Sequence, residues 1–294
     1  MVNTEESGAL EVKEKICHQV KKNWPFAESL NLDEFFQVYT FGADSLNGND
    51  PSLDGGHTSN SRSNLKDNAL YADILKTNQF SSVKRLVKRI LDIIGSLLGL
   101  ILTSPLMLII AVSIKLTSPG PILFRQDRVG FLGGRFIFLK FRSMFVNADQ
   151  KIHERYVTDL IKGRNDKINR GTRDRPLYKM TNDPRVTPIG RVLRKTSLDE
   201  LPQLFNILKG DMSLVGPRPP IPYETKKYRL WHYGRVLEVK PGLTGLWQIS
   251  GRSSTYFDDM VRLDLRYANT WSLWLDIKII LKTFRAVLSA EGAW

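Results

Sequence analysis

The chain has 294 residues, 42% of them apolar, and a formal net charge of +13. This content is enough for one large domain or two small ones with a buried core, and the basic excess favours an anionic partner, whether a phosphorylated substrate, a phospholipid surface or a nucleic acid. One cysteine, Cys17, excludes a disulfide framework and a cysteine-based metal site, and four scattered histidines argue against a histidine-rich one.

Residues 1–83 are predicted to form a polar N-terminal extension. They hold twelve acidic and seven basic side chains, so all of the positive excess lies in the rest of the chain. Residues 41–66 are rich in Gly, Ser, Asn and Asp and have almost nothing to bury, which indicates a flexible linker. We expect the extension to be largely flexible and separate from the remainder of the protein.

Residues 84–118 predict a membrane segment. Between Arg89 and Lys115 lie 25 residues whose only charge is Asp92. As a straight helix they would extend about 37 Å, enough for a bilayer core of roughly 30 Å. Asp92 lies one turn inside this run, where it is expected to pair with Lys88 or Arg89 at the level of the lipid headgroups. A buried core helix is an alternative.

Ser104 and Pro105 interrupt that run near its middle. Proline removes a backbone donor and bends a helix, and basic residues on both flanks oppose placing either flank on the non-cytoplasmic side. These features favour a re-entrant helix–break–helix, with arms of about 20 Å that are too short to cross. The Ser104 hydroxyl would bond a carbonyl freed at the break. A kinked transmembrane helix is the other alternative.

Residues 119–294 predict an α/β domain that is mainly α-helical. The segments PILFRQ and RFIFLKF, residues 121–126 and 135–141, read as short strands on either side of a glycine-containing turn. Residues 145–180 are charged and compatible with helix, and no chemistry is evident in them. Near the C-terminus, an apolar stripe flanked by tryptophans, residues 271–288, predicts either an interfacial amphipathic helix or one packed on the domain's own core.

Two adjacent acids, Asp199 and Glu200, are the strongest candidates for chemistry. Apolar residues at helical spacing run from Leu198 to Leu208, and Asp199 lies at the positive end of the predicted helix dipole. There a carboxylate stays ionised and exposed amides can hold a phosphate, so Asp199 is a candidate Mg²⁺ ligand, general base or nucleophile. Glu200 either takes part or closes a capping box with Ser197.

Basic side chains near this pair are candidate phosphate clamps. They are Arg191, Arg194 and Lys195 before the pair and Arg218 after it. Arg218 stands between two prolines, which limit the freedom of its backbone, and its planar guanidinium suits a phosphate. The alternative for Arg218 is a plain surface turn residue.

Five segments resemble, in order, the bacterial monotopic phosphoglycosyl transferases, the sugar-transferase family that starts glycan assembly on polyprenyl phosphate. They are SPGPILFRQDRVG, FLKFRSM, TSLDELPQLFNILKGDMSLVGPRPP, KPGLTGLWQISGR and LDLRY, all within residues 84–294. Each segment is modest alone, but five in order behind a Ser-Pro-interrupted apolar run are specific. The acidic extension departs from the minimal family pattern and lacks the hydrophobic spans of the largest members, so its role is open.

The resemblance implies a reaction and a set of site residues. A sugar 1-phosphate would move from a UDP-sugar to undecaprenyl phosphate, releasing UMP, with Mg²⁺ required. By position, Asp199 matches the nucleophile and a metal ligand, Glu200 its acidic partner, and Arg218 the phosphate-binding arginine. Further active-site or phosphate-binding positions are matched by Lys140, Arg142, Arg194, Arg252 and Asp264.

The resemblance also implies a location and partners. The hairpin would enter and leave at the cytoplasmic face of the bacterial inner membrane, in the first membrane step of exopolysaccharide, O-antigen or capsule synthesis. The segments RKTSLDELPQ and SAEGAW favour UDP-glucose or UDP-galactose as the donor. A homodimer is an open expectation, and no nucleic acid is expected because no binding motif is present. A membrane-anchored scaffold is the non-enzymatic alternative, which the intact acidic pair argues against.

Overall fold

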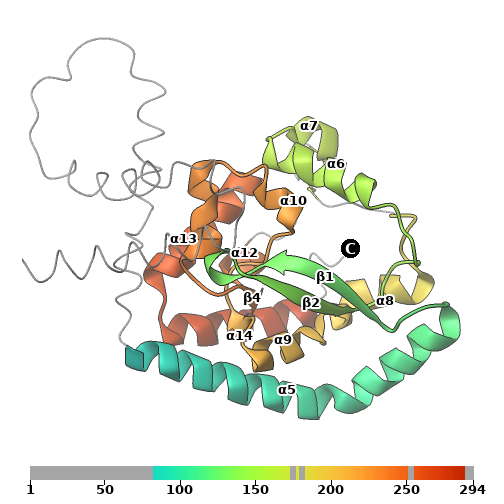
Figure 1. The fold of residues 1–294 in the computed structure, drawn as a ribbon, viewed down its shortest axis with the longest axis horizontal. Helices are drawn as coiled ribbons and strands as arrows, with labels where there is room; N and C mark the ends of the chain where they lie inside the picture. Colours follow the sequence, from blue (N-terminus) through green and yellow to red (C-terminus); the bar gives the residue numbers. More distant parts are fainter. Residues whose placement is uncertain (1–81, 173–176, 179–182, 251–254, 289–294) are drawn as a thin grey trace, which may run out of the picture.

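The computed structural model describes residues 82–172, 177–178, 183–250 and 255–288. Arg252, the predicted linker at 41–66 and nearly all of the extension lie outside these ranges. Within them the chain is mostly helical with two small sheets (Figure 1), which confirms the predicted α/β class with mainly α content.

Ten helices and four strands make up the described part of the chain, together with short 3-10 helices. The helices are α5 (Ser82–Thr117), α6 (Gln150–Ile161), α7 (Asn165–Ile168), α8 (Pro188–Thr196), α9 (Gln203–Lys209), α10 (Pro222–Thr225), α11 (Gly234–Leu237), α12 (Leu246–Ser250), α13 (Phe257–Thr270) and α14 (Leu273–Leu288). The strands are β1 (Leu123–Val129), β2 (Arg135–Phe141), β3 (Ser213–Val215) and β4 (Gly242–Thr244), and the 3-10 helices are η2 (Phe131–Gly133), η3 (Leu198–Glu200) and η4 (Leu230–Tyr233).

An antiparallel hairpin, β1–β2, lies between α5 and α6 and confirms both predicted strands (Figure 1). Its register pairs Leu123 with Phe141. Helix α9 packs against it through Asn206, whose amide donates to the Ile137 carbonyl at 2.7 Å and accepts from the Leu139 amide at 3.0 Å. Because the acidic pair directly precedes α9, this fastening sets it against β2.

A parallel pair, β3–β4, supports the Gly-Pro-Arg-Pro turn that comes after β3. The two backbones approach so closely that a Cβ on Gly242 would lie 2.0 Å from the Gly216 nitrogen. The Gly242 amide in turn donates to the Pro217 carbonyl at 2.8 Å. Glycine at these two positions therefore lets β4 hold the turn in place.

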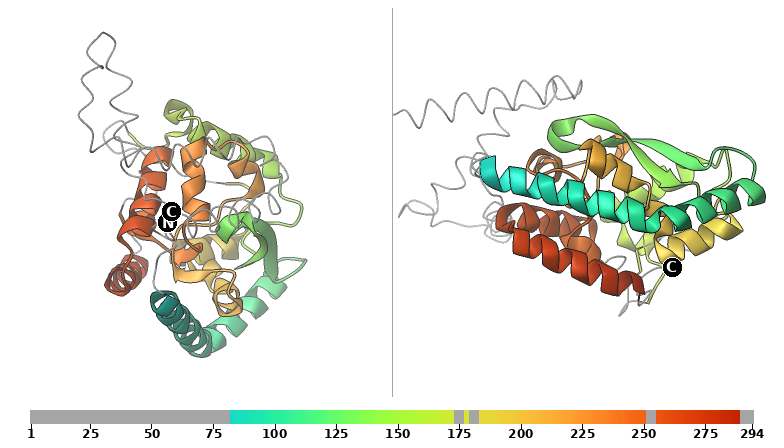
Figure 2. Two further views of the ribbon diagram at one scale, coloured as in Figure 1. Left: turned by 60° about the vertical axis from the view of Figure 1, so that its left-hand side comes forward. Right: turned by 90° about the horizontal axis from the view of Figure 1, so that it is seen from below.

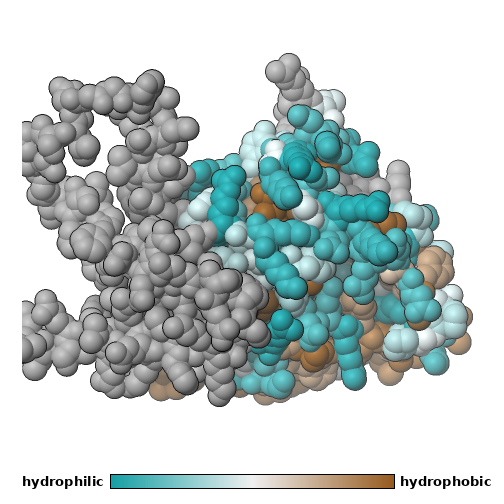
Figure 3. All heavy atoms as spheres, turned by 45° about the horizontal axis from the view of Figure 1, so that its top comes forward, coloured by the Kyte–Doolittle hydropathy of each residue, from teal (hydrophilic) through white to brown (hydrophobic). Residues whose placement is uncertain are grey.

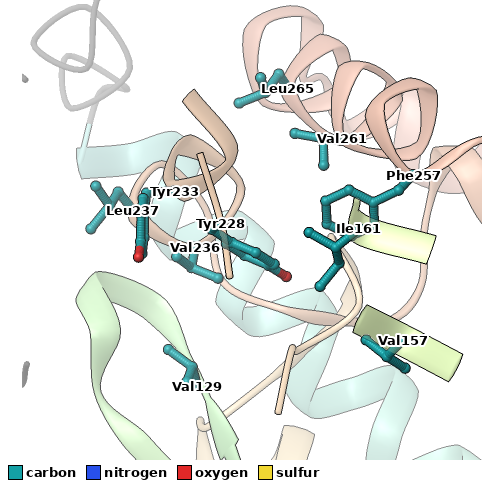
Figure 4. Close-up of a cluster of buried hydrophobic side chains, with 10 residues drawn as sticks. All are labelled: Val129, Val157, Ile161, Tyr228, Tyr233, Val236, Leu237, Phe257, Val261 and Leu265. Carbon is teal, nitrogen blue, oxygen red and sulfur yellow. The ribbon is translucent and has the colours of Figure 1, made fainter. Parts of the chain in front are cut away.

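A buried apolar core joins α6 to α11 and α13 (Figure 4). Its members are Val129, Val157, Ile161, Tyr228, Tyr233, Val236, Leu237, Phe257, Val261 and Leu265. Helix α6 lies on the side of the β1–β2 hairpin opposite α5 (Figures 1 and 2). The core thus fixes α6, a segment in which the sequence showed no chemistry, within the main domain.

Helix α5 runs along one edge of the domain and is the one helix of the described residues that is long and apolar enough to cross a membrane. Only 11% of its most apolar window is buried inside the domain, which excludes a buried core helix. The helix continues through Pro105, and Figure 1 shows a bend near its middle. The structure therefore has one continuous, bent helix where a helix–break–helix was predicted.

Ser104 plays the hydrogen-bonding part predicted for it. Pro105 has no amide hydrogen, so the carbonyl of Ile101, four residues earlier, lacks its helical donor. The Ser104 hydroxyl donates to that carbonyl at 2.9 Å. This bond explains how the helix keeps its course across a proline within an apolar segment.

Charged residues at the start of α5 face the domain. The Lys88 ammonium lies 2.7 Å from the Asp276 carboxylate of α14. Arg89 donates to the carbonyls of Ile207 and Leu208 at 2.6 and 2.7 Å, so it supplies further donors to the last turn of α9. These contacts tie α5 to both α9 and α14.

Asp92 departs from the prediction that it pairs with a neighbouring cation at the headgroups. It is buried and accepts from the Ser213 hydroxyl and the Leu214 amide, both at 2.9 Å. The prediction was wrong because a carboxylate one turn into the helix can reach β3, whose backbone and side chain each offer it a donor. Asp92 thereby joins α5 to the strand that leads into the Gly-Pro-Arg-Pro turn.

Helix α14 lies beside α5 (Figure 2), and both helices carry exposed apolar residues. One side of α14 packs on the domain through the fully buried Ile279, while Trp274, Ile277, Leu281 and Phe284 are exposed. On α5 the exposed apolar residues include Leu98, Ile101, Leu102, Leu108 and Ile109. The face turned away from α5 is mainly hydrophilic, with hydrophobic surface toward its lower edge (Figure 3).

Candidate active site

The acidic pair lies in a tight connection between α8 and α9. Ser197 ends α8 in the left-handed region, with φ of 58°, and so turns the chain back toward β2. Asp199 and Glu200 come next in the 3-10 turn η3, and Pro202 precedes the first residue of α9. The predicted capping box is absent, because the Ser197 side chain accepts no capping hydrogen bond. Glu200 is therefore free for other partners.

Lys140 on β2 binds both carboxylates. Its ammonium lies 2.7 Å from Glu200 Oε1 and 3.6 Å from Asp199 Oδ2. Arg218 reaches the same pair, with Nη1 3.6 Å from Glu200 Oε1. The structure thus brings together four of the residues selected from the sequence, which come from β2, η3 and the turn after β3.

The environment drives the pKa values of the two acids apart. Burial raises the pKa of Asp199, and the charge of Glu200 adds to this, while Lys140 and Arg194 oppose it. Burial acts in the same direction on Glu200, but Lys140 and Arg218 outweigh it and lower its pKa to about 2. Adjacent acids in such different states suit separate chemical roles. The surrounding cations therefore favour a charged Glu200, whereas burial opposes the charge on Asp199.

A buried ion pair supports the Gly-Pro-Arg-Pro turn. Arg235 lies 2.7 Å from Asp264 and donates to the Arg218 carbonyl at 3.4 Å. Burial raises the pKa of Asp264 to about 6, although Arg235 opposes the shift. Asp264, matched by resemblance to an active-site position, therefore supports the turn that carries Arg218 and makes no contact with the acidic pair.

The other residues selected from the sequence also differ in whether they act on the acidic pair. Arg194 donates to the Ser143 hydroxyl at 2.9 Å, and its charge acts on Asp199, so it belongs to the site. Arg142 is buried and donates to the carbonyls of Ser118 and Pro119 at 2.7 and 2.8 Å. Arg142 thus closes the end of α5, and within the described residues nothing links it to the acidic pair.

Several charged and polar residues of the site were missed in the sequence. Arg128 at the end of β1, His153 on α6, Arg185 and Tyr223 gather beside Arg218. The charges of Arg128, Arg185, Arg194 and Arg218 all act on His153. Strand alternation could have placed Arg128, because it lies two residues from Gln126 and therefore on the same face of β1. No such pattern marks His153.

Similarity to known proteins agrees with these features. Residues 83–290 match the sequence model for bacterial sugar transferases. Similar proteins include an undecaprenyl-phosphate galactose phosphotransferase of Salmonella typhimurium, 43% identical over 75% of this chain and 44% of the relative. A UDP-glucose:undecaprenyl-phosphate glucose-1-phosphate transferase of Caulobacter vibrioides is 41% identical over 70% and 72%.

The exopolysaccharide production protein ExoY of Rhizobium meliloti is 39% identical over 74% of this chain and 93% of its own length. The chain spans about half the length of the first relatives that it matches. The matched range nevertheless contains α5, both sheets and the acidic pair with its cations. The chain belongs to the bacterial sugar transferase family.

Proposed function

We propose that the protein transfers a sugar 1-phosphate from a UDP-sugar to undecaprenyl phosphate and releases UMP, as the first membrane step of a bacterial glycan pathway. The family and the names of its relatives support this reaction class. The observation that carries the proposal is the acidic pair bridged by Lys140 next to Arg218. Phosphoryl transfer depends mainly on positioning and on charges aimed at the phosphate, which this cluster offers.

In the proposed covalent route, a carboxylate oxygen of Asp199 attacks the β-phosphorus of the donor. A new Asp199–phosphorus bond forms while the bond to the leaving oxygen of UMP breaks, and UMP departs with that electron pair. A phosphate oxygen of the lipid then attacks the aspartyl phosphate, which yields the lipid-linked sugar diphosphate and restores the carboxylate. Direct displacement, with Asp199 acting as base or metal ligand only, is the alternative.

Mg²⁺ fits the donor set of the acidic pair when substrate is present. The described residues contain no cluster of three or more metal-ligating side chains. Mg²⁺ commonly takes one or two carboxylates and completes its shell with water and substrate phosphates. Asp199, with Glu200 beside it, would hold the ion, which would offset the charge of the diphosphate.

An intact-mass measurement tests the covalent route. The full chain is incubated with UDP-glucose or UDP-galactose and Mg²⁺ but without lipid, and we expect an added hexose phosphate that maps to Asp199. Asp199→Asn should carry no adduct and no turnover. Asp127→Asn, an exposed acid on β1, is the matched control and should behave as the parent chain does. Intersecting initial-rate lines together with no adduct would instead establish direct displacement.

The identity of the sugar needs a separate assay. The relatives' names include both galactose and glucose transferases, and we propose a UDP-hexose of one of these two kinds as donor. UMP release from a panel of UDP-sugars, with undecaprenyl phosphate present, would identify it. Release of UMP from neither UDP-glucose nor UDP-galactose would contradict the proposed donor.

We also propose that α5 enters and leaves the bacterial inner membrane on its cytoplasmic face. Near its start, Lys88, Arg89 and Asp92 bind α14, α9 and β3. At its end, Arg142 on β2 binds Ser118. Both ends of the helix are therefore attached to one domain, which supports a location on one side of the bilayer. The apolar residues exposed on α5 and α14 would face lipid.

Cysteine labelling tests this topology. Cysteines are placed at positions 83 and 120 in a Cys17→Ser background, and whole cells are treated with a reagent that does not cross membranes. We expect neither position to be labelled until the inner face of the membrane is opened. Labelling of one position from outside would show that the helix spans the bilayer.

A further inference from the structure

Arg128 is a buried cation without a matching anion. Only 7% of its surface is exposed, although it lies at the end of a strand near the surface of the domain. Its guanidinium donates to the side-chain oxygen of Gln126 at 3.0 Å and to the Pro219 carbonyl at 2.7 Å, both neutral acceptors. Within the described residues no carboxylate forms an ion pair with it. Buried arginines are usually paired, so this one points to an anionic ligand.

The groups around Arg128 make an anion-binding surface. Burial lowers the pKa of Arg128 to about 10, and the nearby charge of Arg218 contributes, so the two guanidinium groups lie close enough to repel. Glu224 and Glu200 act on Arg128 in the opposite sense. Two neighbouring cations that share one set of distant carboxylates are stabilised when a phosphate binds between them.

His153 adds a neutral donor to this surface. Burial and the surrounding arginines lower the pKa of His153 to about 4, so it is neutral near pH 7. Burial raises the pKa of Tyr223, which keeps its proton. The Tyr223 hydroxyl lies within hydrogen-bond distance of His153 Nδ1. When that nitrogen accepts, Nε2 carries the ring hydrogen, and no acceptor for it lies within the described part of the chain.

The position of these residues indicates which phosphate they hold. His153 belongs to α6, which lies on the side of the β1–β2 hairpin away from α5 and its exposed apolar residues (Figure 1). A lipid phosphate would approach from the side of α5 and α14. The face turned away from α5 is mainly hydrophilic (Figure 3), and a water-soluble nucleotide would approach from that face.

We propose that Arg128, with His153 and Tyr223, forms the subsite for the phosphate that leaves with the nucleotide. The inference rests on the proposed function, because it divides the donor diphosphate between two sets of side chains. Lys140 and Arg218 hold the phosphate that is transferred, beside Asp199. Arg128 and the Nε2 hydrogen of His153 hold the phosphate of the departing UMP.

Calorimetry with UMP tests the subsite on the full chain in lipid nanodiscs. Arg128→Gln should weaken UMP binding at least tenfold and raise the KM for the UDP-sugar, while the KM for undecaprenyl phosphate changes less than twofold. Arg125→Gln, an exposed arginine on the same strand, should leave UMP binding within twofold of the parent. His153→Gln should weaken UMP binding about threefold to tenfold, since it loses one neutral hydrogen bond.

Two results would overturn the subsite. One is UMP binding within twofold of the parent for both Arg128→Gln and His153→Gln. The other is a rise confined to the KM for the lipid, which would assign Arg128 to the acceptor. If Arg128→Gln does not fold, His153→Gln alone decides, because the His153 side chain is only half-buried. UMP release by the parent chain distinguishes failure of the subsite from failure of the proposed function. The proposed function is contradicted if the parent neither binds nor releases UMP.

Discussion

Replacing Lys140 with methionine removes the charge that bridges the acidic pair while keeping the length of the side chain. Lys140 lies 2.7 Å from Glu200 and 3.6 Å from Asp199. At an effective dielectric constant near 20, unit charges at these separations attract by roughly 5 to 6 kcal/mol before solvent screening. Loss of that attraction raises the pKa of both acids, because burial and their mutual repulsion then act without opposition from this cation.

The size of the shift can be judged from Glu200. Lys140 is the strongest of the charges that lower the pKa of Glu200 from 4.5 to about 2. Without Lys140 the pKa of Glu200 should rise toward its ordinary value, although Arg218 and Arg128 still oppose the rise, and the pKa of Asp199 should rise further above its ordinary value. The acidic limb of a pH profile of kcat/KM should therefore move upward by up to about two units, so that activity at the acidic end falls more than activity near pH 9.

The assay is UMP release from pH 5 to pH 9, with melting temperatures measured in parallel. Lys140→Arg keeps the charge and should keep the acidic limb within half a unit, at reduced kcat. Arg135→Met, an exposed cation on the same strand, should leave the profile unchanged. A loss of equal size at every pH, with the limb unmoved, would refute the reasoning, because Lys140 would then act on substrate phosphates alone and would not set the pKa of the acidic pair.

Three further predictions concern other parts of the structure. Gly242→Ala places a Cβ 2.0 Å from the Gly216 nitrogen, so it should cost about 1–3 kcal/mol, lower the melting temperature by roughly 3–10 °C and reduce kcat through the displaced turn; a normal melting curve would contradict this. Ser104→Ala should destabilise α5 by about 1 kcal/mol, but much less in a Pro105→Ala background, where the restored amide serves the same carbonyl; equal effects in both backgrounds would exclude that bond. Deletion of residues 1–80 should leave UMP release largely intact, and a folded, inserted but inactive truncation would assign the extension to the catalytic unit.

The parts of the site that could be predicted from sequence are those fixed by local chemistry. Asp199, Glu200 and Arg218 lie within one short segment. The two adjacent acids mark a candidate site for chemistry, and the prolines on either side of Arg218 limit the freedom of its backbone. Ser104 was predictable for the same reason, since a proline always leaves the carbonyl four residues earlier without a donor. Both strands of the β1–β2 hairpin were predictable from β-forming residues on either side of glycine.

The remaining features depend on contacts between distant segments. The capping box at Ser197 failed because that residue adopts a left-handed conformation to turn the chain between two helices. Asp92 bonds to a strand more than a hundred residues away, and His153 reaches the site only because an apolar core holds α6 there. No spacing in the sequence records such contacts, so they needed the folded chain.

The contacts at the start of α5 have a consequence for protein engineering. Lys88, Arg89 and Asp92 fasten α5 to the two segments that present the acidic pair and the Gly-Pro-Arg-Pro turn. Helix α5 is therefore not a module that can be exchanged for an unrelated helix, or removed, without loss of these contacts. A usable chimera would have to keep the polar residues from Lys88 to Ser96 and also the later residues that pack on the domain, such as Ile110 and Ile114, so that only the exposed apolar positions of α5 change.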